Sequence, residues 1–505
     1  MLLILSLPIL VIILPSLFFS TRNNDSVHPL PPSPAKLPII GNLHQLTELP
    51  HRSLRSLSDR HGPLMLLRLG SLPVLVASCP SVVREITQTH EHLFANRSFL
   101  KATNVYHGRD IAFAPYGEYW REMRKMTILH LLNNKKVKSY KQARKEEVAF
   151  MIKQIEGTTV IDMSKLFNAL SRDVISRAVF GATTRRIWWG DSMRSLISDN
   201  LSLMGEFHVG DYIPWLGKAV GFVSRFERRL RKTFERTDKL LEEIVREQRR
   251  MGMEKRQQEG DGDGANECFL HVLLTVQEEM KCRGVVFDDT SIKAITKDML
   301  IAGTDSTSIP MEWAMVELLR HPIAMKKLKE EITNVVGCNE TVVKEEQLAE
   351  MSYLKAIVKE VLRLHPPTTL IVRRLLTGDT IIKGYRIPKG TMVFINAWAI
   401  GRDPKIWDSP EEFRPERFIN GEGRDLGFIN HGFQLLAFGA GTRSCPGIQF
   451  SVSLIELAIA NLVHVFDWKP AKGEVKDIDM GEVYGLTTRK REALLLIATM
   501  KALQN

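Results

Sequence analysis

One short segment, residues 437–450 (AFGAGTRSCPGIQF), constrains the fold and chemistry of this chain more than any other. It fits the pattern F-G-x-G-x-R-x-C-x-G through Phe438, Gly439, Gly441, Arg443, Cys445 and Gly447. At ordinary residue frequencies such a match arises by chance on the order of 10⁻⁸ times per starting position. A buried structural cysteine in a glycine turn would explain Cys445 but would leave its neighbours unexplained.

The segment resembles the haem-binding loop of the cytochrome P-450 family. The resemblance implies haem b (iron protoporphyrin IX) as cofactor and Cys445 as the ligand of its iron. The residue types fit, because the thiolate is the metal-binding form of cysteine, and glycines let a loop turn backbone N–H groups toward sulfur. In that family the thiolate favours O–O cleavage. Arg443 is then expected to pair with a haem propionate.

The composition indicates a globular protein of a reducing compartment. The chain has 505 residues, of which 44% are hydrophobic, enough to bury a large core. Its five cysteines are scattered without a C-x-x-C pair, which argues against a disulfide framework or a structural zinc site. The net charge of +11 suits anionic lipid or an acidic protein partner. Nucleic acid is not expected, because no basic block carries interleaved aromatic residues.

Residues 1–20 (MLLILSLPILVIILPSLFFS) carry no charge and predict a single transmembrane anchor. A helix of this length spans roughly 30 Å, the thickness of a bilayer core. A cleaved signal peptide is the alternative, but no Lys or Arg precedes the apolar run and no small-residue cleavage site ends it. Positive charges follow it at Arg22, Lys36 and Arg52. The rest of the chain is therefore expected in the cytosol, on the endoplasmic-reticulum membrane that the resemblance implies.

The remainder of the chain predicts one large, mainly α-helical domain with small β-sheets, the fold of the family it resembles. The prolines within 28–42 indicate that residues 21–45 form a stiff, extended linker to a haem-binding domain at 46–505. The predicted elements are a hairpin at 63–78, mainly helices at 80–365, β-type stretches at 366–400 and a last helix near 448–466.

Other segments resemble the same family in the same order. Trp120 and Arg124 lie four apart, so one helix face would present an indole N–H and a guanidinium to the haem propionates. Without the cysteine loop, an amphipathic helix with a core tryptophan would be the simpler interpretation. Arg374 matches a further propionate arginine. Its neighbour Arg373 stands where relatives usually have proline and is an alternative for that role.

Three charged residues are expected to form a structural ion network beneath the haem loop. Glu360 and Arg363 lie three apart on one helix face, and such a pair alone is usually a weak surface salt bridge. Arg417, in FRPERF (413–418), supplies the third partner that the resemblance implies.

The segment DMLIAGTDSTSIPMEW (298–313) resembles the oxygen-activating helix of the family. Small Ala302 and Gly303 would leave room for dioxygen over the haem. The residues that the resemblance assigns to proton delivery are Asp305, Ser306 and Thr307. Pro310 has no N–H for the carbonyl of Ser306, which predicts an opening or bend in the helix. Taken alone, A-G-x-D-S-T would be a weak signal, such as a kinked buried helix.

The electrons for a monooxygenase must come from another protein. The sequence contains no G-x-G-x-x-G behind a predicted strand and no flavin domain. The resemblance implies an NADPH-cytochrome reductase, a flavoprotein, as partner. The basic run 133–145 (NNKKVKSYKQARK) would steer such an acidic partner, or it is merely a solvated helix.

The main hypothesis is a monooxygenase that oxidises a small apolar plant specialised metabolite, with a terpenoid favoured over a phenylpropanoid or coumarin and over an alkaloid. A haem isomerase or dehydratase that needs no reductase is the second hypothesis, and a non-catalytic haem protein is the third. The pocket is expected to be lined from 100–115, the region of Phe207, 298–307, 368–373 and the region of Leu486.

Overall fold

The computed structural model describes residues 28–181, 191–206, 208–220, 225–259, 268–282, 287–337, 340–428 and 432–501. The predicted anchor at 1–20, the first part of the predicted linker and Phe207 lie outside these residues.

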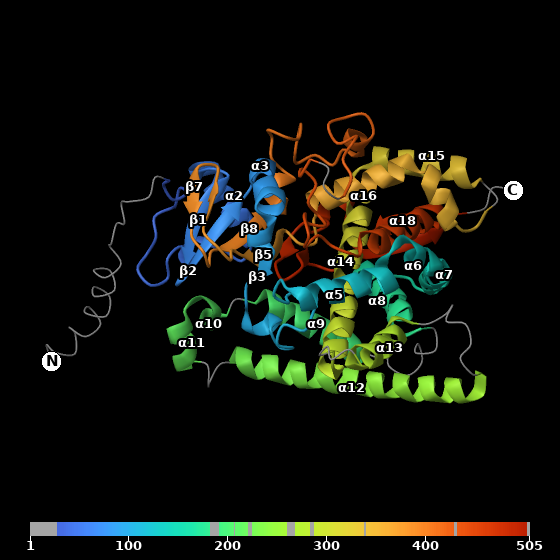
Figure 1. Ribbon diagram of the computed structural model, residues 1–505. Coiled ribbons are helices and arrows are strands. Elements are labelled where there is room, and N and C mark those ends of the chain that lie inside the picture. The colour runs from blue at the N-terminus through green and yellow to red at the C-terminus, as the bar shows by residue number, and fades with distance from the viewer. Residues whose placement is uncertain are drawn as a thin grey trace, which may run out of the picture.

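A five-stranded sheet dominates one side of the molecule (Figure 1). Its strands, in order across the sheet, are β1 (Leu64–Leu69), β2 (Leu72–Ala77), β8 (Met392–Asn396), β5 (Leu370–Leu375) and β3 (Asn96–Arg97). β2 and β8 are parallel, and the other neighbours are antiparallel. The predicted hairpin is confirmed as β1 and β2. It turns at Gly70, where a Cβ would lie 2.4 Å from the carbonyl oxygen of Tyr212.

Helices form the rest of the body, as predicted. The longer ones are α5 (Glu118–Thr127), α7 (Lys141–Glu156), α8 (Met163–Phe180), α9 (Asp191–Gly205), α12 (Arg225–Glu259), α13 (Phe269–Cys282), α14 (Asp289–Arg320), α15 (Pro322–Val336), α16 (Ser352–Leu364) and α18 (Ile448–Val465). The shorter ones include α2 (Pro50–His61), α3 (Pro80–Arg84), α4 (Glu91–Phe94), α6 (Asn134–Ser139), α10 (Val209–Tyr212), α11 (Pro214–Val220) and α17 (Ala397–Ile400). The small strands are β4 (Ile161–Asp162), β6 (Thr380–Ile382), β7 (Tyr385–Ile387), β9 (Phe466–Pro470), β10 (Glu482–Val483), β11 (Arg489–Lys490) and β12 (Leu495–Met500).

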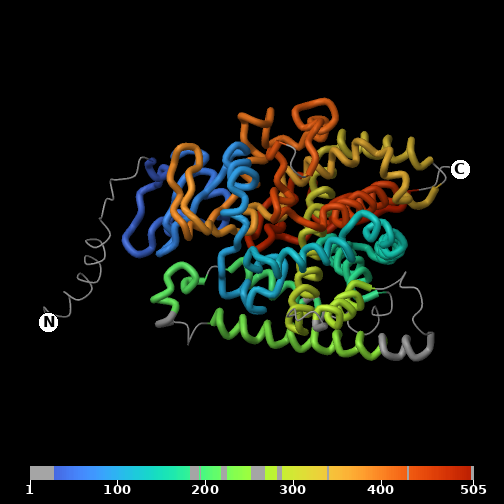
Figure 2. Tube along the Cα trace, in the orientation of Figure 1, coloured from blue at the N-terminus to red at the C-terminus, as the bar shows by residue number. Residues whose placement is uncertain are grey.

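Helix α14 runs through the middle of the body, and the other long helices surround it (Figures 1 and 2). The carboxylate of Asp288 caps its first turn by accepting the N–H of Ser291 at 3.0 Å. It is buried on most sides and packs against α8, α16 and α18. Pro310 lies inside this helix without ending it. A helix buried on all sides can position groups for chemistry in the interior.

Helix α18 follows the cysteine loop directly and lies in the core. Among the described helices it is the one long and apolar enough to cross a membrane, but most of it is buried against other elements. Its apolar composition therefore reflects a core position. The start of α18 fixes the end of the cysteine loop against α14.

The proline-rich segment is bound along the β-rich side of the domain. The carbonyl of Pro29 accepts the N–H of Arg386, and the carbonyl of Pro32 accepts the N–H of Leu66, both at 2.9 Å. The described part of the predicted linker is extended, as its prolines require, and its backbone is anchored to the sheet region.

Candidate active site

The cysteine loop, residues 437–450, folds through tight glycine turns. Gly441 has a φ of +69°, and a Cβ there would lie 2.6 Å from the carbonyl oxygen of Thr87. The backbone N–H of Cys445 donates to the carbonyl of Phe438 at 2.9 Å and closes the loop. The geometry thus requires glycine at this position of the motif.

The sulfur of Cys445 has the surroundings of a metal ligand. Burial raises the pKa of the Cys445 thiol, while the N–H of Gly447, 3.4 Å from the sulfur, and the guanidinium of Arg124 act in the opposite direction. A coordinated cation would complete the deprotonation. No group of three His, Cys, Asp or Glu side chains suited to a metal occurs among the described residues. The site therefore fits a metal that needs one protein ligand because a macrocycle supplies the others.

Four arginines converge beside this loop: Arg97 from β3, Arg124 from α5, Arg374 from β5 and Arg443 from the loop itself. Their guanidiniums donate hydrogen bonds to backbone carbonyls. In the part of the chain that the structure describes, none of them has a carboxylate oxygen within 4.0 Å. Burial first, and then repulsion by Arg374 and Arg124, lowers the pKa of Arg443 to about 9.

This cluster fits the two propionates of a haem. An uncompensated buried charge is costly, and four such guanidiniums require an anionic partner. Nε and Nη1 of Arg374 are buried and have no hydrogen-bond partner among the residues that the structure describes. Burial lowers the pKa of Arg374 to about 10. Free donors of this kind, next to a cysteine loop that lacks any other metal ligand, match a flat dianionic cofactor.

Trp120 lies among the arginines, but its N–H is engaged by the protein. Its indole nitrogen donates to the carbonyl of Ile111 at 2.9 Å. The guanidinium carbon of Arg443 lies 4.0 Å from the centroid of its ring, and that of Arg124 lies 5.4 Å away. Trp120 thus supports two of the arginines and holds the loop at Ile111. Its predicted bond to a propionate stays a prediction.

Two arginine assignments go beyond what the sequence predicts. Arg97 is not predicted, because the segment FANRS (94–98) contains no second residue at a helical or strand spacing that would indicate a shared site. For the pair that the sequence left open, the structure turns Arg374 toward the cysteine loop, where its Nη2 donates to the carbonyl of Ala440 at 2.6 Å. Arg373 instead lines a separate pocket.

The two small residues of α14 differ in their surroundings, because a Cβ on Gly303 would lie 2.9 Å from a side-chain carbon of Ile175 in α8. Ala302 is exposed although most of the helix around it is buried. The hydroxyl of Ser306 donates to the carbonyl of Ala302. Thr307 donates instead to the hydroxyl of Ser451 in α18, at 3.1 Å, and so joins the two helices. Of the two hydroxyls, that of Ser306 lies on the exposed side of the helix, beside Ala302, and that of Thr307 is buried.

Asp305 lies in a different environment from the two hydroxyls. Its carboxylate accepts the amide N–H of Asn168 from α8 at 2.8 Å. Burial raises the pKa of Asp305, and Arg489 and Asn168 oppose that shift. The side chain is therefore able to hold a proton closer to neutral pH than an exposed aspartate.

The predicted ion network is confirmed. Glu360 accepts from Nε and Nη2 of Arg363 at 2.7 and 2.8 Å, and from Nε of Arg417 at 3.1 Å. All three side chains are fully buried. Because α16 also packs against α18, the network supports the element that carries the cysteine loop.

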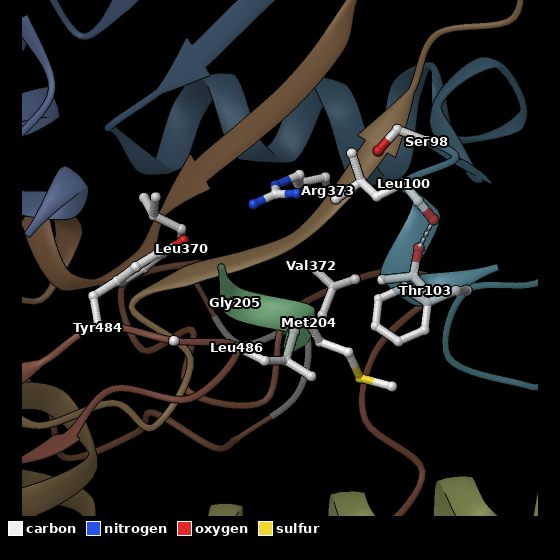
Figure 3. Close-up of a pocket in the computed structure, with 12 residues that line it drawn as sticks. Ser98, Leu100, Thr103, Met204, Gly205, Leu370, Val372, Arg373, Tyr484 and Leu486 are labelled. Carbon is white, nitrogen blue, oxygen red and sulfur yellow. Dashed lines mark hydrogen bonds between the residues drawn. The ribbon is translucent and has the colours of Figure 1, made fainter. Parts of the chain in front are cut away.

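A pocket of about 470 Å³, including its open mouth, lies between β5, α9 and the loop that follows β3. Figure 3 shows apolar side chains, among them Leu370, Val372, Met204 and Leu486, together with Arg373. Most of the segments that the sequence predicts for the pocket contribute to this one, while 298–307 does not.

Comparison with known proteins agrees with a haem site at the cysteine loop. The family model described as Cytochrome P450 matches residues 31–497. The protein Cytochrome P450 736A117 of Prunus mume is 43% identical over 500 residues, which cover 97% of this chain and 94% of that protein. (+)-Menthofuran synthase of Mentha piperita is 42% identical, with 93% of each chain covered. Tabersonine/lochnericine 19-hydroxylase of Catharanthus roseus is 38% identical, with 95% and 94% covered.

Proposed function

Because this chain belongs to the cytochrome P450 family of haem-thiolate monooxygenases, we propose that it oxidises an apolar plant specialised metabolite, a terpenoid, with O2 and electrons from an NADPH-dependent reductase. The observation that carries the proposal is the buried pairing of one cysteine loop with four arginines that lack carboxylate partners. A relative named (+)-menthofuran synthase supports the terpenoid, and a relative that acts on tabersonine supports the alkaloid as an alternative. A phenylpropanoid or coumarin is the other alternative.

The roles of the residues follow from their positions. When bound, haem supplies the iron at which O2 is reduced and cleaved. Cys445 would hold this iron as a thiolate, and the propionates would be held by Arg97, Arg124, Arg374 and Arg443, with Trp120 beneath Arg443. Such charge-assisted bonds are worth about 1.5–3 kcal/mol each.

Proton delivery is assigned to α14. Ser306 lies beside the exposed Ala302, so its Oγ would be the atom that passes protons toward O2. Asp305, with its raised pKa, would recharge that relay from the side of Asn168. Thr307 is placed to hold α14 against α18 and would act by positioning Ser306.

A basic face near α5 and α6 supports docking of an acidic reductase. Lys135, Lys138 and Lys145 of the predicted basic run are exposed. Two other members of the run are paired within the domain: Lys141 with Glu346, and the buried Arg144 with Glu345. A further hollow is lined by Arg121, Arg124, Lys125 and Leu129. Arg124 connects this face to the cysteine loop, because it donates to the carbonyl of Ser444, the residue before Cys445.

A second apolar surface supports membrane association in addition to the predicted anchor. Trp215 in α11 is 59% exposed, and Leu37 and Ile39 are 48% and 38% exposed. Tyr212 and Ile213 pack in one cluster with the β1–β2 hairpin and Ile40, so these segments are neighbours (Figure 1). Together with an uncleaved anchor at 1–20, they would hold the body on the cytosolic face of the endoplasmic reticulum.

A reconstitution tests the proposed function. The full chain is incorporated into liposomes with an NADPH-cytochrome reductase and offered terpenoids, alkaloids and phenylpropanoids, with products identified by mass spectrometry. We expect a product one oxygen heavier that requires NADPH, O2 and the reductase, and that is absent with Cys445→Ser. Turnover without the reductase would contradict the proposal and favour an isomerase or dehydratase. A folded, haem-loaded protein that binds and oxidises none of the compounds would favour a non-catalytic haem protein.

A further inference from the structure

Arg373 and Arg374 are neighbours in β5, but their side chains lie in different surroundings. The pairing of β5 with β8 changes register just before Arg374, so the strand bulges at Val372 and Arg373. Arg97 donates to the carbonyls of both bulged residues and holds this shape. Arg374 reaches the cysteine loop, whereas Arg373 lines the pocket described above. The bulged strand therefore carries one arginine, Arg373, that lies in the pocket and takes no part in the arginine cluster beside the cysteine loop.

The guanidinium of Arg373 has no carboxylate partner. It lies over the ring of Phe394, 5.5 Å from the centroid. No carboxylate oxygen is within 4.0 Å of it in the described part of the chain. The phenol of Tyr484 is its side-chain hydrogen-bond partner, and Tyr212 is a further polar neighbour. The carboxylate that acts on it, Asp211, accepts the backbone N–H of Lys101 at 3.1 Å.

This situation differs from that of the other arginines in the interior. Those paired with a carboxylate are Arg144, Arg363, Arg402 and Arg417. Those beside the cysteine loop donate to backbone carbonyls and face the place of the propionates. Among the described residues, the side chain of Arg373 has neither a carboxylate nor a backbone carbonyl as partner, and its polar neighbour is the neutral phenol of Tyr484. An arginine does not lose its charge in a protein, so the pocket keeps a permanent cation that no described anion neutralises.

The rest of the pocket is mostly apolar. Figure 3 shows the guanidinium of Arg373 at some distance from Met204 and Leu486, with Val372 between them in this view. Leu100 and Leu370 complete the hydrocarbon wall. A ligand that fits both features has an extended hydrocarbon part and one anionic end.

We propose that Arg373 binds the carboxylate of the substrate, so that the enzyme selects amphiphilic acids over their neutral counterparts. The inference rests on the proposed monooxygenase function and names its substrate class. A planar guanidinium binds a carboxylate through two parallel N–H···O bonds. A neutral ester or alcohol would accept hydrogen bonds but would leave the charge unpaired in a partly desolvated pocket.

Optical titration of the haem-loaded full chain tests this inference. The probes are geranic, farnesoic and cinnamic acids, each with its methyl ester, and the readout is the dissociation constant from the change in the haem spectrum. We expect at least one acid to bind tenfold or more tightly than its ester. Arg373→Gln should reduce that ratio to within twofold, mainly by weakening the acid, and Arg373→Lys should restore part of it.

Arg84→Gln is the matched control. The guanidinium of Arg84 also lies over a phenylalanine ring, 5.6 Å from the centroid of Phe433, but it is exposed and does not line the pocket. This variant should leave the ratio of acid to ester unchanged. The proposal is overturned if no acid binds more tightly than its ester, or if the ratio survives Arg373→Gln.

Failure of this inference is distinguishable from failure of the proposed function. Each variant is also examined as the reduced carbon-monoxide complex, which reports an intact thiolate-bound haem. Wild-type protein that shows this spectrum and oxidises a neutral compound with NADPH, yet has no preference for acids, refutes only the role of Arg373. Loss of the spectrum in Arg373→Gln, with normal Arg373→Lys, would show that the residue stabilises the fold and would also overturn the proposal.

Discussion

Replacing Glu360 by Gln should destabilise the whole domain rather than the chemistry. Glu360 is fully buried and accepts bonds from two guanidiniums and from the backbone N–H of Arg414 at 2.8 Å. Glutamine keeps the shape of the side chain but removes its charge. One of its two ends also becomes an N–H donor that faces the donors of Arg363 or Arg417.

The expected loss in the free energy of unfolding depends on the partners that Arg363 and Arg417 retain after the substitution. Removal of one partner from a buried ion pair costs about 3–5 kcal/mol. Arg417 retains Glu422, so its charge is still compensated. Within the described part of the chain, Arg363 then retains three backbone carbonyls as its acceptors. Because one guanidinium of the two loses its counter-ion, we expect the lower end of that range, about 3 kcal/mol in the free energy of unfolding.

Urea unfolding, followed by tryptophan fluorescence and by the carbon-monoxide spectrum, measures this change. Glu330→Gln is the control. It is the same Glu-to-Gln change, but in an exposed pair in which Oε1 of Glu330 lies 3.8 Å from Nζ of Lys326. Exposed pairs of this type contribute little, so the control should unfold like the wild type. If Glu360→Gln unfolds at the same urea concentration as Glu330→Gln, the network does not stabilise the domain and the reasoning is refuted.

Three further experiments test the cysteine ligand, the anchor and the proton path. Cys445→Ser should abolish the red-shifted Soret band of the reduced carbon-monoxide complex, and a surviving band would exclude Cys445 as the ligand. Deletion of residues 1–20 should release much of the protein from membranes with the haem spectrum intact; complete loss of haem would make the anchor part of the core. Ser306→Thr and Pro310→Val should each raise the ratio of product to NADPH consumed, and Ser306→Ala should lower it. Unchanged coupling in all three would place the proton path elsewhere.

The features that the sequence predicts well are local. Gly441 in the cysteine loop is predictable because its turn, with a φ of +69°, depends on a few neighbouring residues, whereas its close contact with Thr87 joins segments far apart in the chain. Trp120 and Arg124 share a helix face because four residues make about one turn. The acceptors of these groups lie outside the helix: the N–H of Trp120 goes to Ile111 in the preceding loop, and the guanidinium of Arg124 goes to the carbonyl of Ser444, 320 positions later.

The features that the sequence does not predict arise from long-range pairing. The basic run 133–145 contains Arg144, which is buried against Glu345, about 200 positions later in the chain. Arg97 joins the arginine cluster only because β3 pairs with β5. A lone residue with no periodic partner carries no signal of such pairing, so its role is visible only after the strands are placed.

The strand β5 connects the two halves of the proposed chemistry. In a regular strand, neighbouring side chains point to opposite faces. Here the bulge at Val372 and Arg373 also shifts the register of β5 against β8 just before Arg374. One arginine is thereby held against the cysteine loop and its neighbour against the pocket. Arg97, which would bind a propionate, also holds the bulge through the carbonyl of Val372. Occupancy of the propionate site and the position of the carboxylate-binding cation are therefore linked through a single side chain. A substitution of Arg97 would weaken haem retention and also loosen the selection of the substrate.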